Sequence, residues 1–177
     1  MDRHSENAIK INEQLKKHPR VKNVYFPWNE ENAGHEAAIK QMKQPGGVIS
    51  FELQEGGKQE AQAFLNKLQL IKIAVSLGDV ETLISHPASM THAVIPEKER
   101  RAMGVTDQLI RLSVGLESWE DIWADIEQAL NGWLFEGNGI ELFYGSIFFI
   151  FGVLIWIVYT KLDKNYKVYC LNSTGDR

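Results

Sequence analysis

The sequence of 177 residues has a single cysteine, Cys170, only five prolines and no basic excess, since its formal net charge is -4. One cysteine excludes an internal disulfide framework and favours a reducing compartment. The net negative charge argues against nucleic acid as a partner, because that function needs a basic surface. The N-terminal stretch MDRHSENAIK also lacks the apolar core of a secretory signal peptide. These absences favour a globular protein that is not exported.

Several catalytic signatures are also missing. The sequence has no glycine-rich phosphate-binding motif and no G-x-S-x-G nucleophile motif. The stretch HEAAI begins like a zinc-protease helix, but Ile39 stands where the second histidine would be needed. His86 and His92 are separated by six positions in a loop with a proline, which is not a metal-ligand spacing. We expect both histidines to form local hydrogen bonds, and the sequence predicts no metal site.

One long hydrophobic run sets the C-terminal part of the chain apart. Residues 142–159 carry no charge, and at about 1.5 Å per helical residue they approach the thickness of a bilayer core. We expect a linker at 132–141, a hydrophobic tail helix at 142–159 that is long enough to span a membrane, and a polar tail at 160–177. In a spanning helix, the lysines that follow it would favour a cytoplasmic C-terminus.

Residues 1–131 have the mixed patterning of a globular domain. The apolar spacing predicts helices from Ser5 to before Pro19 and over 29–43, 58–68 and 118–131. Ser118 is the expected N-cap of the last helix, with Asp121 three positions later. β-branched and aromatic content predicts strands over 21–27, 46–53, 71–77 and 109–117, with a loop between the last two. This order predicts an α/β fold of the α+β type, a two-layer sandwich of helices on a small antiparallel or mixed sheet.

Arg111 is the most informative single residue. It lies in the apolar strand LIRLSVGLE, where an unpaired guanidinium would be costly to desolvate. One interpretation places it on a solvated sheet face or against an internal acidic side chain. The other makes it a bidentate clamp for a substrate carboxylate, which suits its planar fork of donors. Ser76, before a Leu-Gly turn, is placed where a hydroxyl and backbone amides could join such a clamp.

Four stretches of the sequence resemble one enzyme family. They are MDRHSENA, QMKQPGGVISFEL, AVSLGDVETLISHPASMTHA and GVTDQLIRLSVGLESWEDIWADIEQAL. Together they are similar to the C-terminal domain of the fold-type I, pyridoxal-phosphate-dependent enzymes of cysteine and methionine metabolism, which include the transsulfuration enzymes. The segments SLGDVETL, HPASMTH and QPGG are most similar to those of methionine γ-lyase and cystathionine γ-lyase. The resemblance covers residues 1–131.

The resemblance implies an activity and a role for three residues. In such enzymes a sulfur amino acid reacts with pyridoxal phosphate, which acts as an electron sink while a sulfur leaving group departs. The arginine that matches Arg111 grips the α-carboxylate, and the serine that matches Ser76 assists it. The glutamate that matches Glu81 lies close to the substrate side chain in some members. The family also implies a cytoplasmic location and an oligomer, either with a second copy or with a full-length homologue.

The sequence departs from this family in what it lacks. The family's Schiff-base lysine lies in a Ser-x-Thr-Lys-like segment upstream of the matching region, and no serine of this chain has a lysine three residues later. We therefore expect a fragment of a carbon–sulfur lyase or γ-synthase, from a truncated or frameshifted gene, that has no catalytic or cofactor-binding residue and is inactive alone. Two alternatives stay open. One is a noncatalytic, tail-anchored protein that pairs with a full-length homologue, and the other is a split enzyme whose lysine domain is a separate chain.

Overall fold

The computed structural model describes residues 1–132. In chain order the elements of this part are α1 (Asp2–Lys17), β1 (Val21–Tyr25), α2 (His35–Gln41), β2 (Val48–Leu53), α3 (Lys58–Asn66), β3 (Lys72–Ile73), β4 (Leu83–Ser85), α4 (Glu97–Ala102), β5 (Leu109–Ser113) and α5 (Trp119–Gly132). The strands form one sheet in the order β1-β2-β5-β4-β3. β3 pairs parallel with β4, and the other neighbours are antiparallel, so the predicted mixed sheet with helices is confirmed.

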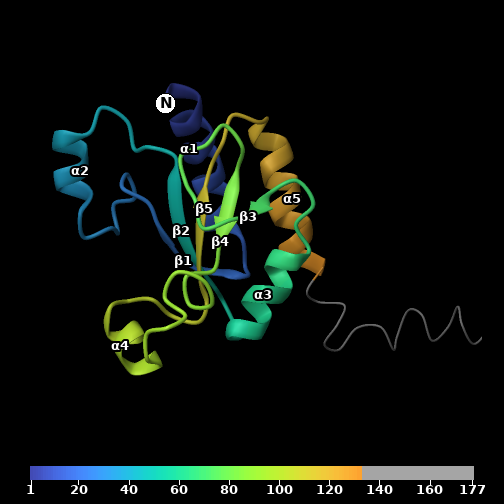
Figure 1. The fold of residues 1–177 in the computed structure, drawn as a ribbon. Helices are drawn as coiled ribbons and strands as arrows, with labels where there is room; N and C mark the ends of the chain where they lie inside the picture. The colour runs from blue at the N-terminus through green and yellow to red at the C-terminus, as the bar shows by residue number, and fades with distance from the viewer. Residues whose placement is uncertain (133–177) are drawn as a thin grey trace, which may run out of the picture. The chain divides into compact units, whose positions relative to one another are not determined.

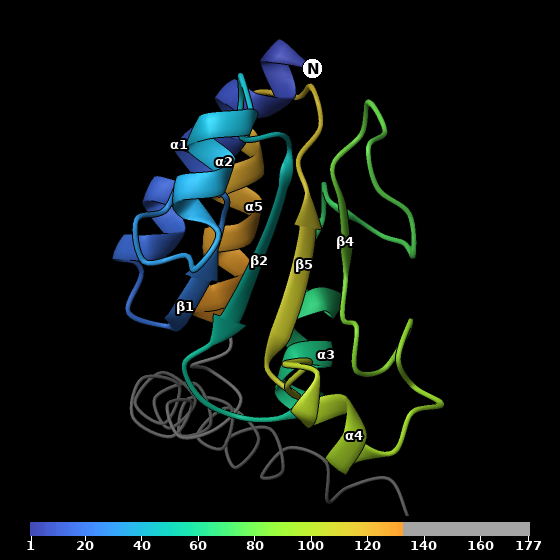
Figure 2. The same ribbon diagram turned by 90° about the vertical axis from the view of Figure 1, so that its left-hand side faces the viewer.

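The helices divide unequally between the two faces of this sheet. In Figure 1, α3 and α5 lie to one side of the strands, and α2 and α4 lie at opposite ends of the other side. α1 packs against β1, β2 and α5, and Figure 2 shows α1 and α5 along the same side of β2. One face of the sheet is therefore covered by α1, α3 and α5, and we call it the core face. No helix of residues 1–132 crosses the centre of the opposite face, and we call it the open face.

The core face follows from strand alternation. Ile49 and Phe51 of β2 and Ile110 and Leu112 of β5 point to it, and each is fully buried. Phe51 meets Phe64 of α3 edge-on, with ring centroids 6.1 Å apart. The residues between them, such as Ser50 and Arg111, point to the open face because successive side chains of a strand alternate. The alternating sequence of β5 therefore places apolar side chains on the core face and a charged side chain on the open face.

A buried carboxylate fixes how the sheet edge meets α5. Asp125 of α5 accepts hydrogen bonds from the backbone amides of Gln69, Leu70 and Ile71 at 2.8 to 3.0 Å. These three amides lie between α3 and β3, where no strand partner is available to them. The carboxylate thus satisfies the backbone of a tight connection and holds the start of β3 against α5.

Several predicted boundaries were wrong. The expected strand at 71–77 is only Lys72–Ile73, and residues 74–77 form a loop. The segment between it and β5 was predicted as a plain loop but contains β4 and α4. The strands predicted over 46–53 and 109–117 are shorter, and the helix predicted over 29–43 is limited to α2. Ser118 directly precedes α5, as predicted, and its hydroxyl donates to the carboxylate of Glu120.

The predicted linker, the hydrophobic tail helix at 142–159 and the polar tail lie outside the described residues. Within residues 1–132, no helix combines the length and the apolar character that a membrane crossing requires.

Candidate functional site

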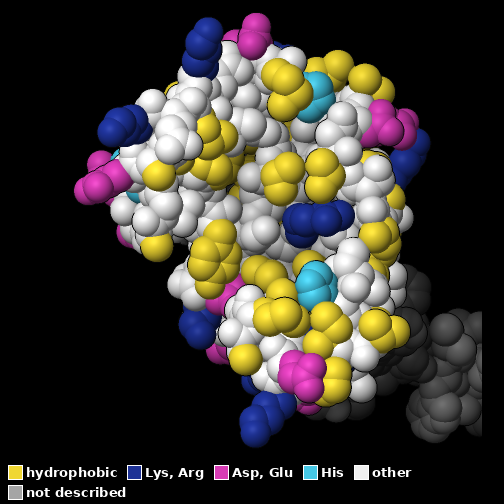
Figure 3. All heavy atoms as spheres, turned by 60° about the vertical axis from the view of Figure 1, so that its left-hand side comes forward, with side chains coloured by type: hydrophobic (Ala, Val, Ile, Leu, Met, Phe, Trp, Pro, Cys, Tyr) yellow, Lys and Arg dark blue, Asp and Glu magenta, His cyan; other side chains and the backbone are white. Residues whose placement is uncertain are grey.

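Four residues form a row across the open face, one from each of four neighbouring strands. Tyr25 of β1 pairs with Ser50 of β2, Ser50 pairs with Arg111 of β5, and Arg111 pairs with Ser85 of β4. Residues paired in this way have side chains on the same face of the sheet. The row therefore places one guanidinium between two serine side chains at the centre of the sheet. Figure 3 shows this side of the molecule, where a basic side chain near the centre is bordered by hydrophobic side chains and a histidine.

Arg111 is half-buried and has an incomplete set of partners. The Nη2 atom of its guanidinium donates a hydrogen bond to the backbone oxygen of Ser76 at 3.1 Å. Among residues 1–132, no acidic side chain forms an ion pair with it. A guanidinium has five N–H donors in a fixed plane, so most of its hydrogen-bonding capacity is open to an incoming acceptor. The structure thus excludes the predicted alternative of an internal acidic partner within this part of the chain.

The two serines beside Arg111 differ in burial. Ser50 is half-buried, whereas Ser85 is 1% exposed and its Oγ has no hydrogen-bond partner among residues 1–132. A buried hydroxyl without a partner costs stability, so native proteins keep few of them. Such a group next to Arg111 indicates that the local arrangement is set by something besides the stability of this part of the chain.

The loop that contains Ser76 folds over β5. Gly78 has a φ of +78°, a conformation that favours glycine, and its amide donates to Ser113 Oγ at 2.8 Å. Further along, Thr82 is anchored by Glu117, whose carboxylate accepts from its amide and its hydroxyl at 2.6 and 2.8 Å. These bonds hold the loop over the open face. Ser76 lies within this loop and not at the end of a strand as predicted, and it contacts Arg111 through its carbonyl.

Glu81, the third predicted site residue, lies at the far end of the same loop. Its carboxylate forms an exposed ion pair with Lys72 of β3 at 2.6 Å. The structure therefore brings Arg111 and Ser76 into contact and places Glu81 at the sheet edge beside Lys72.

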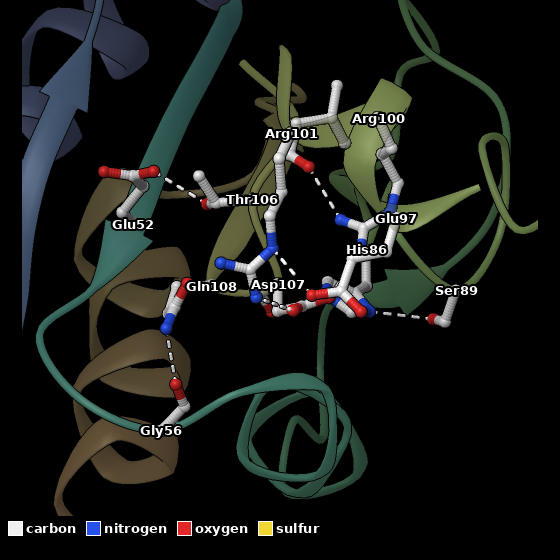
Figure 4. A network of polar contacts seen from close by, with 11 residues as sticks. Glu52, Gly56, His86, Ser89, Glu97, Arg100, Arg101, Thr106, Asp107 and Gln108 are labelled. Atoms are coloured by element: carbon white, nitrogen blue, oxygen red, sulfur yellow. Dashed lines mark hydrogen bonds and ion pairs between the residues drawn. The ribbon is translucent and has the colours of Figure 1, made fainter. Parts of the chain in front are cut away.

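A buried polar cluster supports the start of β5 (Figure 4). Arg100 of α4 is 1% exposed, and its guanidinium donates to Asp107 at 2.6 Å. Asp107 also accepts from Arg101 at 2.7 Å. Burial acts to raise the pKa of Asp107, but Arg100 and Arg101 outweigh it and lower that pKa below its usual value. The ionised pair fixes the turn that leads into β5 and towards Arg111.

His86 joins this cluster from the end of β4. Its ring is fully buried, with Nε2 2.9 Å from the backbone oxygen of Asp107 and Nδ1 2.8 Å from Ser89 Oγ. A carbonyl can only accept, so Nε2 carries the proton. Burial lowers the pKa of His86, although the bond to Asp107 opposes this. The prediction of local hydrogen bonds is confirmed for His92, which bonds to Thr91, and for His86, which bonds to Ser89. His86 also has a long-range partner that the sequence did not indicate, the backbone oxygen of Asp107, 21 positions away.

Another buried carboxylate, that of Glu52, lies on the open face. Glu52 is 7% exposed and accepts from Asn23 at 2.7 Å, Tyr25 at 3.3 Å and Thr106 at 2.7 Å. Burial acts to raise the pKa of Glu52, but these hydrogen bonds outweigh it, so that pKa is lowered. Its three neutral donors tie β1 and the segment before β5 to β2.

The described part of the chain offers no metal site and no buried amine. No group of three or more His, Cys, Asp and Glu side chains in residues 1–132 could hold a metal ion. Every lysine there is exposed or half-buried, so none lies in an enclosed pocket as an attachment site for a cofactor.

Sequence reasoning missed Ser50, Ser85 and Glu52. Alternation along β2 could have shown the face of Ser50 and Glu52, whereas β4, which contains Ser85, is too short to show it. The strand register that brings Ser50 and Ser85 beside Arg111 could not be read from the sequence. The signal that was available for Glu52 is a charged residue in the otherwise apolar strand GGVISFEL, the same signal that identified Arg111.

The chain is similar to enzymes of sulfur amino-acid metabolism. The L-methionine gamma-lyase of Fusobacterium nucleatum subsp. polymorphum is 57% identical over 130 residues, which are 73% of this chain and 33% of that enzyme. The cystathionine beta-lyase of Coxiella burnetii is 49% identical, with the same shares covered. Among solved structures, cystathionine gamma-lyase from Lactobacillus plantarum complexed with L-serine matches with a TM-score of 0.70 at 45% identity, over 74% of this chain and 34% of that one.

These relatives and the family assignment agree. The chain spans about a third of the length of the curated relatives that it matches. Residues 1–131 match the family described as Cys/Met metabolism PLP-dependent enzyme, where PLP is pyridoxal phosphate. The earlier resemblance is thus confirmed, and the chain belongs to the family of Cys/Met metabolism PLP-dependent enzymes.

Proposed function

We propose that residues 1–131 are the substrate-carboxylate domain of a pyridoxal-phosphate-dependent carbon–sulfur lyase or γ-synthase, and that this domain is inactive alone. The substrate class is a sulfur amino acid, as the names of the relatives suggest for those proteins. The observation that carries the proposal is Arg111. It lies at the centre of the open face, between Ser50 and Ser85, without an acidic partner in the described part of the chain.

The geometry suits recognition of a carboxylate. A guanidinium can donate two parallel N–H bonds to the two oxygens of a carboxylate, and such bonds are stronger than those between neutral groups. Arg111 uses one N–H for Ser76, and this bond orients the planar fork before a substrate arrives. The desolvation cost of the half-buried charge is then offset by the substrate's own charge.

Ser76 and Glu81 have supporting roles in this proposal. Ser76 positions Arg111 through its carbonyl, and its exposed hydroxyl is available as a further donor to the substrate. Glu81 lies on the same loop, where it contributes to the surface that faces the substrate side chain. Its pairing with Lys72 keeps that part of the loop close to electrically neutral.

The described residues do not fit the cofactor itself. When bound, pyridoxal phosphate withdraws electrons from substrate carbons whose bonds are breaking. Its attachment needs a lysine in the substrate pocket, whereas Lys72, the lysine on the loop's own strand, is exposed and paired with Glu81. Residues 1–132 therefore hold and orient the substrate, and the cofactor-holding groups belong to the part of the family enzymes that this chain does not match.

A chimeric enzyme tests this proposal. The matching 130 residues of the Fusobacterium nucleatum subsp. polymorphum L-methionine gamma-lyase are replaced by residues 1–131 of this chain. We expect the chimera to release thiol from L-methionine within about tenfold of the parent rate, because one family fold supplies both domains. The isolated chain should release none. A chimera that folds and binds the cofactor, yet releases no thiol from L-methionine or L-cystathionine, would contradict the proposal.

A further inference from the structure

Strand β4 connects the strand of Arg111 to the start of the loop that contains Ser76. It has only three residues, and its last residue, Ser85, pairs with Arg111 of β5. On its other side, the backbone oxygen of Ile84 accepts the amide of Ala74 at 3.0 Å. The register of β4 on β5 therefore sets where this loop begins, and with it where the carbonyl of Ser76 meets Arg111.

Such a short strand needs contacts beyond its own ends to fix its register. Three residue pairs join β4 to β5, and a slip of one residue would turn every side chain of β4 to the other face of the sheet. Where β4 begins, the carboxylate of Glu117 accepts from the amide and the hydroxyl of Thr82. The same hydroxyl accepts from the amide of Gly115 at 2.9 Å. This end of β4 is thus bonded to the segment that follows β5.

His86 holds the other end of β4. It directly follows the strand, and Nε2 of its fully buried ring lies 2.9 Å from the backbone oxygen of Asp107, two residues before β5. The carboxylate of Asp107 is in turn paired with Arg100 and Arg101 at 2.6 and 2.7 Å. Figure 4 shows these side chains gathered around Asp107. His86 is therefore joined to a fixed point of the backbone four residues before Arg111.

We propose that His86 is a positioning residue for Arg111. The proposal rests on the proposed function, since it specifies how the carboxylate site is held. His86 fixes the register of β4, which keeps the carbonyl of Ser76 on one N–H of Arg111 and leaves the other donors for the substrate carboxylate. His86 does not touch the substrate, because both of its ring nitrogens have partners within the fold and its ring is fully buried.

The kinetic test uses the chimera of the proposed function with L-methionine and with L-methioninamide, which lacks the carboxylate. His86→Leu removes the Nε2 donor and leaves an apolar side chain of similar size in the buried site. We expect kcat/KM for L-methionine to fall at least about tenfold, mainly through a higher KM, since small misplacements of a binding group are costly. The value for the amide should hardly change, because only the carboxylate depends on the orientation of Arg111.

Two further variants of the cluster sharpen this test. His86→Gln should keep most of the activity towards L-methionine, because its side-chain amide can donate to the same carbonyl. Ser89→Ala removes the partner of His86 Nδ1 and should give a milder loss, about threefold, again for L-methionine alone. Ser89→Ala decides the matter if His86→Leu does not fold, and equal kinetics with and without Ser89 would then overturn the proposal.

His18→Leu is the matched control. His18 is also a buried histidine, 9% exposed, but its ring packs edge-on against Trp123 of α5 with centroids 6.0 Å apart. Its loss should reduce stability without separating the two substrates. The positioning role is overturned if His86→Leu lowers kcat/KM equally for L-methionine and the amide, or if His86→Gln does not restore the use of L-methionine.

Hydrogen exchange in the full chain tests the register of β4 without any activity. The amide of Ala74, which donates to Ile84, should exchange at least about tenfold faster in His86→Leu than in the unaltered chain, and at the same rate in His18→Leu. Equal exchange in His86→Leu and the unaltered chain would overturn the proposal.

The two measurements separate this proposal from the proposed function. If the chimera is active and Arg111→Leu impairs only L-methionine while His86→Leu does not, only the positioning role is overturned. If the chimera is inactive although the Ala74 amide exchanges faster in His86→Leu, only the proposed function is contradicted.

Discussion

The two faces of the sheet differ in the burial of their side chains and in how far their polar groups are hydrogen-bonded. On the core face, Ile49, Phe51, Ile110 and Leu112 are fully buried under three helices. On the open face, the residues between them include a guanidinium without an acidic partner in the described part of the chain and a buried hydroxyl without a hydrogen bond. The same strands thus contribute buried apolar side chains to the core face and polar groups with incomplete hydrogen bonding to the open face. The difference shows that the open face is shaped for contacts that the fold itself does not need.

Neighbouring residues of β2 give the largest contrast. Phe51→Ala removes a fully buried ring that packs on Phe64, and the loss of transfer energy plus a cavity should lower the free energy of unfolding by about 3–5 kcal/mol. Ser50→Ala, one residue earlier but on the open face, should change it by less than about 0.5 kcal/mol. Urea unfolding of both variants measures this. Similar losses for the two variants would mean that the faces do not differ as described.

The second largest effect on stability is expected in the polar cluster around Asp107. Asp107→Ala leaves the buried charge of Arg100 without its partner, which should cost about 3 kcal/mol. Glu97→Ala removes the exposed partner of Arg101 and should cost less than about 1 kcal/mol. Thermal unfolding compares the two. If Asp107→Ala proved as mild as Glu97→Ala, the buried pair would not support the start of β5.

Acid should weaken the fold through two buried histidines. Burial lowers the pKa of His86 and of His18 in the folded chain, so below about pH 6.5 the unfolded chain binds more protons. These two histidines should leave the free energy of unfolding constant above that pH. As the pH falls below it, the free energy of unfolding should decrease until the pH reaches the lowered pKa values of the two histidines in the folded chain. The slope is at most about 1.4 kcal/mol per pH unit for each histidine. His86→Gln should make the fall shallower, and an unchanged profile would contradict the neutral state assigned to His86.

The smallest effect has the opposite sign. Ser85 Oγ is buried without a partner in the described part of the chain, so Ser85→Ala should raise the free energy of unfolding by up to about 1 kcal/mol. The same change in the chimera should weaken its use of L-methionine, because the hydroxyl lies beside Arg111. A loss of stability on Ser85→Ala would show that the hydroxyl has a partner within the fold.

Much of the core face could be predicted from the sequence, because its residues follow strong local periods. The helical spacing of Ile122, Ile126 and Leu130 and the alternation of Ile110 and Leu112 both place buried residues correctly. β4 was missed because three residues are too few to show a period. Its pairing with β5 depends on a contact between distant segments.

The open face was predictable only in part. A lone charge in an apolar strand identified Arg111, but its neighbours Ser50 and Ser85 depend on strand register, which tertiary packing sets. Arg100 lies in the charged run EKERR, which suggests a solvated helix. It is buried instead, and its guanidinium donates to Asp107 and to the backbone oxygen of Val105. Contacts between segments far apart in the chain thus determine the neighbours of Arg111 and the burial of Arg100, which local sequence patterns do not reveal.

The central claim, that Arg111 binds the α-carboxylate of the substrate, has a direct test in the chimera. The kcat/KM values for L-methionine and for L-methioninamide, which lacks the carboxylate, are measured with Arg111 and with Arg111→Leu. The account predicts a loss of at least about 100-fold for L-methionine, since a charged pair is broken, and almost none for the amide. Equal losses for both substrates would contradict it.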